Sequence, residues 1–173
     1  RLEDLTRANG ISHAAAHDAL SDVHATIALA RLVRERQPRL YDYVLKSRDK
    51  RAVLAHLDIA AMKPVLHVSG MFGASRHNIA LVVPLAVHPK NRNEIICFDL
   101  SADPQPLFDL PVDELQSLLY TRTEDLSPGT ERLGFKSSHI NRCPVLLTPK
   151  MADPATAQRL GISGETCRRH LDA

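Results

Sequence analysis

The sequence predicts an α+β protein in which helices occupy the first third of the chain and short strands then form a small barrel with an inserted helix. Three observations predict this fold class. Apolar residues recur at helical spacing up to Leu57, whereas runs rich in Val, Ile and Leu follow from Val65 and are bounded by turn residues. Helical spacing returns between Val112 and Tyr120 and again at the end of the chain. Apolar residues make up 44% of the sequence and aromatic residues 4%, so we expect a mostly aliphatic core.

Four helices are expected before the strands. Asp18 is a good N-cap for the longest of them, and Leu20, Val23 and Ile27 fall on one face of its helical pattern. Pro38 stops this helix because proline cannot continue the backbone hydrogen-bond ladder. The expected helices are 1–9, ended by Gly10, then 18–37, 40–45 and 49–57.

Strands are expected after Met62, where β-branched residues gather in short runs. The turn-forming sequence from His88 to Asn93 predicts a hairpin between two of these runs. One helix is inserted before the last strand region, and two helices close the chain. The expected strands are 65–68, 79–83, 95–98 and a run over 135–147 interrupted by Pro144, and the expected helices are 112–120, 154–160 and 164–171.

Basic residues gather in one stretch, although the net charge of the chain is only +2. Between Arg31 and Arg51, eight Lys and Arg residues stand against three acidic residues, which leaves +5 there and −3 over the rest of the chain. A basic stretch in a nearly neutral protein indicates an anionic partner, either nucleic acid or an acidic peptide. A solvated helix face is the alternative interpretation.

The cysteine content and the hydropathy of the sequence indicate the cellular compartment and bear on membrane association. Cys97, Cys143 and Cys167 are odd in number and widely spaced, which favours reduced thiols and a cytoplasmic protein. The longest apolar run, from Ile79 to Val87, is far shorter than the roughly 20 residues that a membrane-spanning helix needs. We therefore expect no membrane partner.

A histidine stands five residues before an aspartate at the start of the long helix. His17 is expected in the preceding loop and Asp22 in the first helical turn, where the helix dipole favours a negative charge. A loop histidine beside a helix-entry carboxylate suits a metal-bound acid with a proton acceptor next to it. A helix cap next to a surface histidine explains the same two residues, and the short pattern alone is weakly specific.

The residues around this pair, His17-Asp-Ala-x-x-Asp22-x-x-Ala25-Thr26, resemble the third motif of the DnaQ-like DEDDh 3′→5′ exonucleases. Longer blocks resemble the bacterial exodeoxyribonuclease I family. Because several blocks occur in the same order along the chain, they identify the family far more specifically than the short motif does. These blocks are Arg36–Tyr43, Met62–Phe72, Pro84–Pro89 and His139–Leu146. The resemblance implies that residues 1–37 are the C-terminal helices of a ribonuclease H-like exonuclease domain and that residues 38–173 form an SH3-like β-barrel domain with flanking helices.

The resemblance also implies a catalytic mechanism. In the DEDDh family, four acidic residues bind two divalent cations, here expected to be Mg²⁺, and a histidine activates the attacking water. His17 matches that general base, and Asp22 matches the last metal-binding aspartate. The other three acidic residues have no counterpart at matching spacing in this sequence. We expect this chain to be inactive alone, because one carboxylate cannot hold two Mg²⁺ ions.

Binding residues are implied by the same resemblance. Tyr43 and Lys63 lie in blocks that the family uses beside its nuclease cleft, with Arg39, Arg48 and Arg51 as supporting candidates. The implied partners are single-stranded DNA and the acidic C-terminal tail of single-stranded-DNA-binding protein. An aromatic ring next to ammonium groups can stack on a base, or pack against an apolar tail residue while lysine neutralises carboxylates. Without the resemblance, Tyr43 is a half-buried helix residue and Lys63 a solvated charge.

Two classes of function follow from the sequence. The first is part of a single-stranded-DNA-specific 3′→5′ exodeoxyribonuclease that releases nucleoside 5′-monophosphates in DNA repair and recombination, monomeric as the full-length protein. The second is a non-catalytic module that binds single-stranded DNA or the acidic tail of single-stranded-DNA-binding protein. A DnaQ-like exonuclease acting on RNA is a third interpretation, and the block Met62–Phe72 argues against it through resemblance.

Overall fold

The computed structural model describes residues 1–12 and 18–173. Packing divides the chain into unit 1, Arg1–Lys46, and unit 2, Ser47–Ala173. The strands belong to unit 2, whereas the helix that follows Pro38 packs within unit 1. The predicted α+β class is therefore confirmed. The assignment of residues 1–37 to a nuclease domain stays a prediction.

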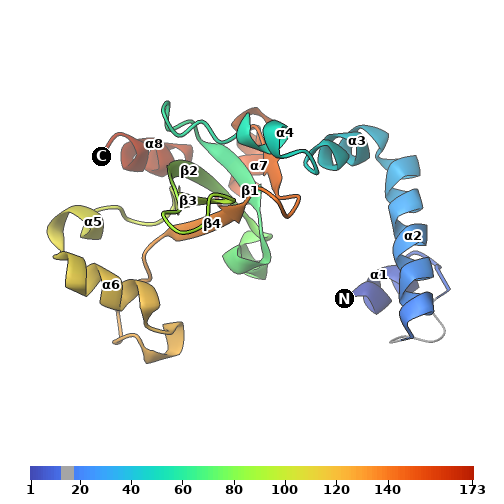
Figure 1. Cartoon of the computed structure of the whole chain (residues 1–173), viewed down its shortest axis with the longest axis horizontal. Helices are drawn as coiled ribbons and strands as arrows, with labels where there is room; N and C mark the ends of the chain where they lie inside the picture. Colours follow the sequence, from blue (N-terminus) through green and yellow to red (C-terminus); the bar gives the residue numbers. More distant parts are fainter. Residues whose placement is uncertain (13–17) are drawn as a thin grey trace. The chain divides into compact units, whose positions relative to one another are not determined.

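Unit 1 contains α1 (Leu2–Ala8), α2 (Ala19–Arg36) and α3 (Pro38–Lys46) (Figure 1). The cap predicted for α2 is present, since the Asp18 carboxylate accepts a hydrogen bond from the backbone N–H of Ser21 at 3.0 Å. Thr6 of α1 and Ala25 of α2 are each only 1% exposed. The interior of unit 1 is therefore built from small side chains.

The apolar face of α2 that the sequence predicts is largely exposed in this chain. Leu20, Val23 and Ile27 are 64%, 52% and 43% exposed. Full burial of such a side chain stabilises a fold by roughly 1.5–3 kcal/mol. These three residues therefore contribute little to the stability of unit 1.

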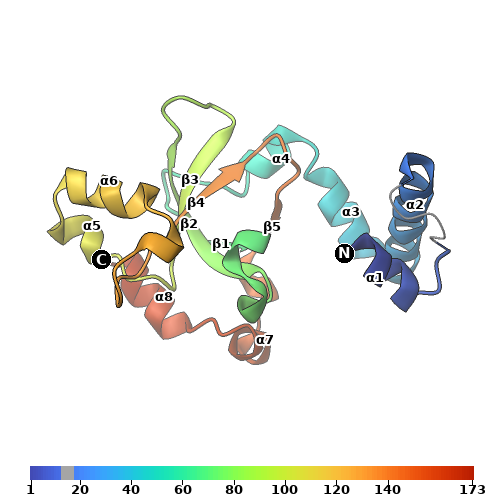
Figure 2. The ribbon, with the colours of Figure 1, turned by 90° about the horizontal axis from the view of Figure 1, so that it is seen from below.

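Unit 2 is organised around a curled antiparallel sheet with the strand order β4-β3-β2-β1-β5 (Figure 2). Its strands are β1 (Val65–Val68), β2 (Ile79–Val87), β3 (Glu94–Asp99), β4 (Phe135–His139) and β5 (Val145–Leu147). The register of β2 against β3 shifts between Pro84 and Ala86, where proline cannot donate to the ladder. The hairpin predicted over residues 88–93 joins β2 to β3.

The predicted run over 135–147 is two strands at opposite edges of the sheet. β4 ends at His139 and pairs with β3, whereas β5 begins at Val145 and pairs with β1. The break lies before Pro144, since β4 ends at His139 and the N–H of Ile140 makes a last hydrogen bond to the carbonyl of Asn93 at 2.9 Å. The intervening turn carries the chain from one edge of the sheet to the other.

Helices of unit 2 flank the sheet. They are α4 (Lys50–Leu54), α5 (Pro106–Asp109), α6 (Val112–Tyr120), α7 (Pro154–Arg159) and α8 (Gly164–Leu171), with single 3₁₀ turns η1 (Gly70–Phe72), η2 (Ala74–Arg76), η3 (Thr123–Asp125) and η4 (Pro149–Met151). The inserted helix α6 and the closing helices α7 and α8 agree with the predicted 112–120, 154–160 and 164–171 to within one residue, whereas the short α5 was not predicted. Helix α4 is shorter than the predicted 49–57. Of the apolar stripe Val53, Leu54 and Leu57 that predicts it, Val53 and Leu57 are buried, whereas Leu54 is 43% exposed.

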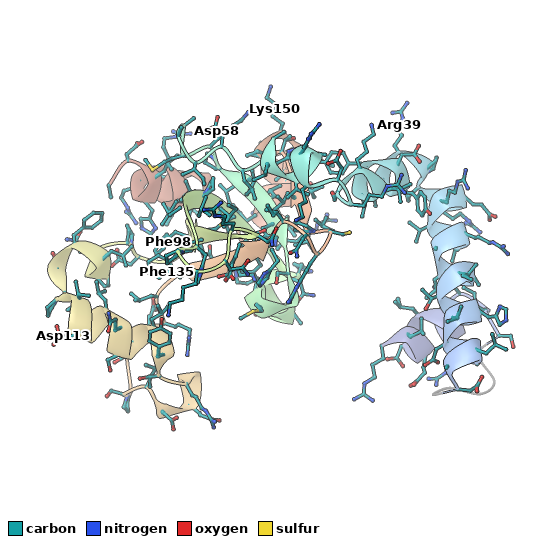
Figure 3. All side chains as sticks on the ribbon, in the orientation of Figure 1. Arg39, Asp58, Phe98, Asp113, Phe135 and Lys150 are labelled. Carbon is teal, nitrogen blue, oxygen red and sulfur yellow. The ribbon has the colours of Figure 1, made fainter. Side chains whose placement is uncertain are left out.

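Two hydrophobic clusters cover opposite faces of the sheet. Val82 and Cys97 belong to one cluster, and their neighbours Val83 and Phe98 belong to the other, since successive strand residues point to opposite faces. Helix α8 completes the second cluster with Cys167. Phe98 and Phe135 meet edge to face across β3 and β4, with ring centroids 5.7 Å apart (Figure 3).

Cys97, Cys143 and Cys167 are free thiols. Among the described residues, no helix is both long and apolar enough to cross a membrane.

Candidate functional site

Asp22 lies in the first turn of α2, as its spacing from the Asp18 cap predicts, and it is half-buried. Its N–H donates to the carbonyl of Asp18 at 2.9 Å, and the hydroxyl of Thr26 donates to the carbonyl of Asp22 at 2.8 Å. The positive end of the helix dipole stabilises a carboxylate at this position. Asp22 therefore lies where its carboxylate complements the helix dipole.

The metal site implied by the resemblance is not completed by the described part of this chain. His17 lies outside the described residues. Within residues 1–12 and 18–173, no three His, Cys, Asp or Glu side chains gather closely enough to hold a metal ion. Asp22 alone does not fit a two-cation site, because Mg²⁺ requires a near-octahedral set of oxygen ligands. His17 and Asp22 therefore remain predicted catalytic residues.

Arg39 and Tyr43 lie four residues apart on α3, so their side chains share one face of the helix. Arg39 is exposed and extends away from the helix (Figure 3). Tyr43 is half-buried, and this burial raises the pKa of its phenol. The face thus offers a partly embedded neutral ring with a cation one turn before it. Such a pair suits a base with its phosphate, or an apolar residue next to a carboxylate.

Lys63 is exposed at the end of a tight turn in unit 2 that precedes β1. Its N–H donates to the carbonyl of Asp58 at 3.1 Å, and the Asp58 carboxylate accepts from the N–H of Ala61 at 3.0 Å. Met62, immediately before Lys63, has a φ of 43°. The backbone at Lys63 is therefore fixed by the turn, while its ammonium group reaches solvent. Lys63 belongs to unit 2 and Tyr43 to unit 1.

Arg48 and Arg51 flank Asp49, the N-cap of α4, and both are exposed. The Asp49 carboxylate accepts from the N–H of Arg51 at 2.8 Å. Lys50 lies between the two arginines and donates to Oδ1 of Asn93 at 2.7 Å. Sequence reasoning missed Lys50 as an organising residue, because its partner lies far along the chain. The basic stretch was the available signal, but it does not reveal which basic residue is anchored.

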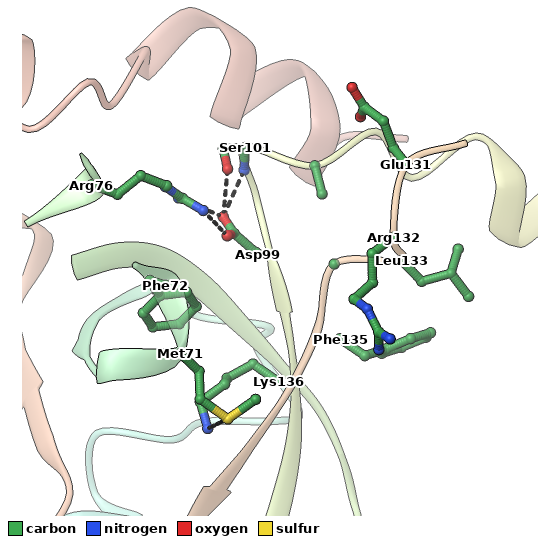
Figure 4. Close-up of a pocket in the computed structure, with 12 residues that line it drawn as sticks. Met71, Phe72, Arg76, Asp99, Ser101, Glu131, Arg132, Leu133, Phe135 and Lys136 are labelled. Carbon is green, nitrogen blue, oxygen red and sulfur yellow. Dashed lines mark hydrogen bonds and ion pairs between the residues drawn. The ribbon is translucent and has the colours of Figure 1, made fainter. Parts of the chain in front are cut away.

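A pocket of about 370 Å³ opens beside β4 and contains a partly buried ion pair (Figure 4). Arg76 Nη1 and Nη2 donate to Asp99 Oδ2 and Oδ1 at 2.5 and 3.2 Å. The same carboxylate accepts from the N–H and the hydroxyl of Ser101 at 3.0 and 2.8 Å. The Asp99 side chain is 9% exposed, so this network fixes η2 to the end of β3. It neutralises Arg76 and leaves that residue unsuited to phosphate binding.

His67 of β1 is buried in the same unit, at 4% exposure. Burial, aided by the nearby Lys136 ammonium, lowers the pKa of His67 to about 4. Its ring meets Phe72 edge on, with centroids 5.7 Å apart, and its Nδ1 has no hydrogen-bond partner among the described residues. His67 is therefore a neutral core residue at physiological pH.

Comparison with known proteins gives a family and close relatives. Residues 48–173 match the family described as Exonuclease I SH3-like domain. The chain is 50% identical over 171 residues to exodeoxyribonuclease I of Escherichia coli (strain K12). This match covers 99% of the chain but 36% of the relative, so the chain spans little more than a third of that protein's length.

Solved structures agree with this match. A crystal structure of E. coli exonuclease I in complex with a dA16 oligonucleotide superposes with a TM-score of 0.94 at 50% identity, covering 99% of this chain and 36% of that one. The zinc-ion-bound form of the E. coli exonuclease I complex with single-stranded DNA gives the same TM-score and identity, covering 99% and 37%.

Proposed function

The chain belongs to the exonuclease I family, whose SH3-like domain it carries, and we propose that it is the C-terminal part of a single-stranded-DNA-specific 3′→5′ exodeoxyribonuclease. The 50% identity to the E. coli enzyme over 99% of this chain carries the proposal. The oligonucleotide in the E. coli structure supports single-stranded DNA as the substrate. Because the chain spans 36% of that relative, the activity is proposed for a longer, monomeric protein that acts in DNA repair in the cytoplasm.

Within that protein, we assign His17 as the general base and Asp22 as a ligand to a divalent cation. A neutral imidazole accepts a proton from the attacking water at physiological pH. Asp22 supplies one carboxylate from the first turn of α2. The zinc-bound E. coli complex supports a divalent cation, and we propose Mg²⁺ as the one used. The described residues add no further ligand set, so the chain alone is expected not to cleave DNA.

A chimera tests this assignment. This chain would replace the corresponding third of E. coli exodeoxyribonuclease I, so that the relative supplies the missing acidic motifs. We expect the chimera to shorten 5′-labelled single-stranded DNA from its 3′ end with Mg²⁺. His17→Ala should lower the rate by roughly 10²–10⁴-fold, the range for loss of a general acid or base. Asp22→Asn should also lower the rate strongly, because it removes a carboxylate that holds the divalent cation.

Matched substitutions control for folding. His24→Ala and Asp42→Asn remove a histidine and a carboxylate from exposed positions of the same unit and should leave the rate unchanged. Shortening of DNA by the 173-residue chain alone would contradict its assignment as an incomplete site. Full activity of the Asp22→Asn chimera would contradict the assigned role of Asp22.

We also propose a binding function that does not require the catalytic site. In unit 1, the Arg39 and Tyr43 face of α3 supports docking of the acidic C-terminal tail of single-stranded-DNA-binding protein. In unit 2, the exposed Lys63 separately offers a cation to a tail carboxylate. A carboxylate recognised by an ammonium forms a charge-assisted hydrogen bond. The partly embedded ring of Tyr43 gives an apolar tail residue a contact surface.

Binding of a fluorescent tail peptide to the chain tests the docking role. We expect Lys63→Ala to weaken binding about tenfold, since a charge-assisted hydrogen bond contributes roughly 1.5–3 kcal/mol. Tyr43→Ala should weaken it by a similar factor, since burying an apolar side chain contributes roughly 1.5–3 kcal/mol. Arg122→Ala and Tyr120→Ala, at exposed positions elsewhere in unit 2, serve as matched controls. Unchanged affinity in both test variants would remove the docking assignment.

A further inference from the structure

Lys136 of β4 is half-buried in the pocket beside that strand (Figure 4). Its cross-strand partner is Cys97 of β3, which is fully buried. No described residue forms an ion pair with the Lys136 ammonium group. A charge that is partly removed from water costs free energy unless an opposite charge accompanies it. The surroundings of Lys136 therefore favour its neutral amine.

The titration of Lys136 reflects this setting. Burial lowers the pKa of its amine, whereas Cys97 and Glu94 of β3 act in the opposite direction. His67 of β1 interacts with the same amine, and Lys136 adds to the lowering of the pKa of His67. When the pKa of a lysine falls, more of its amine is neutral at physiological pH, and the neutral amine is the nucleophilic form. Lys136 is therefore a candidate nucleophile.

The hydrogen bonds of Lys136 orient this amine. Nζ donates to the carbonyl of Ser137 at 2.7 Å and to Sδ of Met71 at 3.9 Å. A neutral amine has two N–H groups and one lone pair, so these two acceptors account for both N–H groups. The lone pair remains on the side of the nitrogen that points away from both acceptors. It is thus available to a molecule that enters the pocket.

The pocket itself is fixed by contacts within unit 2. Gly134 forms part of its wall, and a Cβ at this position would lie 2.6 Å from Cβ of Ala102. Only glycine allows the backbone to approach so closely. The paired side chains of Arg76 and Asp99 fix another part of the wall. The cavity therefore exists before any ligand arrives, which reduces the entropy lost on binding.

The size and lining of the pocket suit a small molecule with an apolar part. Its volume of about 370 Å³ is near the lower end of the range for small-molecule sites. Phe72, Leu133 and Phe135 line it together with Lys136 and offer apolar surface to a short acyl chain (Figure 4). A small acyl phosphate combines such a chain with a carbonyl that is activated by a good leaving group. An acyl thioester of coenzyme A is too large for the cavity.

We propose that Lys136 is a site of covalent acylation by small acyl phosphates. Nζ of the neutral amine attacks the carbonyl carbon and forms a C–N bond. The bond between that carbon and the phosphate oxygen breaks, and inorganic phosphate leaves with the electron pair. The proton lost by the nitrogen passes to water. The product is an uncharged amide, so acylation removes a cation from the pocket and places an apolar chain against its rings. This proposal does not depend on nuclease activity.

Acetyl phosphate is the probe that tests this site. The folded chain would be incubated with it at neutral pH, and acetylation of each lysine would be followed by mass spectrometry of its peptides. We expect Lys136 to react on the order of tenfold faster than the exposed Lys63 and Lys150, because its amine is less protonated and is oriented. The rate at Lys136 should also reach its plateau at a lower pH than the rate at Lys63.

Variants separate the roles of the amine and of its neighbours. Lys136→Arg keeps the charge but removes the nucleophile, so acetylation at this position should be lost while the other lysines react as before. Lys150→Arg is the matched control and should leave the rate at Lys136 unchanged. Met71→Leu removes the sulfur acceptor from a position that is 81% exposed, and it should slow acetylation of Lys136 without disturbing the core.

The ring of His67 gives a second readout, because Lys136 contributes to lowering its pKa. Acetylation should move the NMR titration of this ring to higher pH, and Lys136→Gln should do the same. Lys150→Gln should leave the titration where it is. An unchanged His67 titration after complete acetylation of Lys136 would contradict the loss of charge inside the pocket.

Three further outcomes would overturn the proposal. The first is acetylation of Lys136 no faster than that of Lys63 in the folded chain. The second is a preference for Lys136 that persists in urea, because the reactivity would then belong to the local sequence and not to the pocket. The third is an equal preference for Lys136 with acetyl coenzyme A, which would exclude a cavity that selects a small donor.

Discussion

The buried His67 makes the stability of unit 2 sensitive to acid. Its pKa is lowered from 6.5 to about 4, chiefly because burial penalises the charged imidazolium and also because Lys136 repels it. As pH falls, the unfolded chain therefore takes up a proton at this residue before the folded chain does. The stabilisation is complete above about pH 6.5 and is lost progressively towards pH 4.

We expect urea unfolding to show a loss of roughly 2 kcal/mol at about pH 5, relative to neutral pH, that depends on His67. His67→Leu replaces the ring by an apolar side chain and should flatten this part of the pH profile. It also removes the unpaired buried Nδ1, so stability at neutral pH should not fall by much. The exposed His24→Leu is the control, and a His67→Leu profile identical to that of wild type would refute the role of His67.

For single residues, the sequence predicts which residues are candidates for function better than it predicts which residues they contact in the fold. The position of Asp22 in the first turn of α2 follows from the Asp18 cap, because capping is a local interaction. The contact between Lys50 and Asn93 does not follow from any local pattern. It forms only when α4 lies beside the turn between β2 and β3.

The elements show the same contrast between local and distant causes. Helices α2, α4, α7 and α8 begin where Asp18, Asp49, Asp153 and Ser163 cap them, so the sequence predicts their starts closely. The end of α4 at Leu54 is less predictable, because the buried Leu57 continues the apolar pattern beyond the helix. A periodic pattern records which side chains are buried and does not require that the backbone remain helical.

The pairing of the strands could be predicted only in part from the sequence. The β-rich runs of β1, β2 and β3 are separated by turn signals, and their order in the sheet follows from hairpin pairing. Nothing within residues 135–147 shows that β4 pairs with β3 while β5 pairs with β1. Strand partners are chosen across the sheet, so Pro144 marks a break without showing where each half goes.

At the scale of the whole molecule, the two units differ in how well they are packed. Both hydrophobic clusters found among the described residues consist of unit 2 residues, from Val53 to Leu171. In unit 1 the buried positions Thr6 and Ala25 carry small side chains, and the apolar face of α2 is exposed. Free energies of local opening follow such differences in buried apolar surface.

We therefore expect unit 1 to open before unit 2 in the isolated chain. Hydrogen exchange resolved by peptide should show the amides of α2 exchanging at lower opening free energies than those of β2 and β3. A chain truncated to residues 47–173 should keep the same protection in its strands, since the strands pair within unit 2. Equal opening free energies for α2 and β2 would show that the units unfold together, contrary to this expectation.

The path of the chain between β3 and β4 has a practical consequence. Phe98 and Phe135 are cross-strand partners, so the polypeptide leaves the sheet and re-enters it at one place. The intervening α5 and α6 extend to one side of the sheet in both views (Figures 1 and 2). The entropic cost of closing a loop grows only slowly with the length of the loop. A reporter domain inserted between Tyr120 and Ser127 should therefore leave the strand register intact. The connection between β3 and β4 is therefore a site where unit 2 can be labelled without changing the residues assigned to DNA or to the tail peptide.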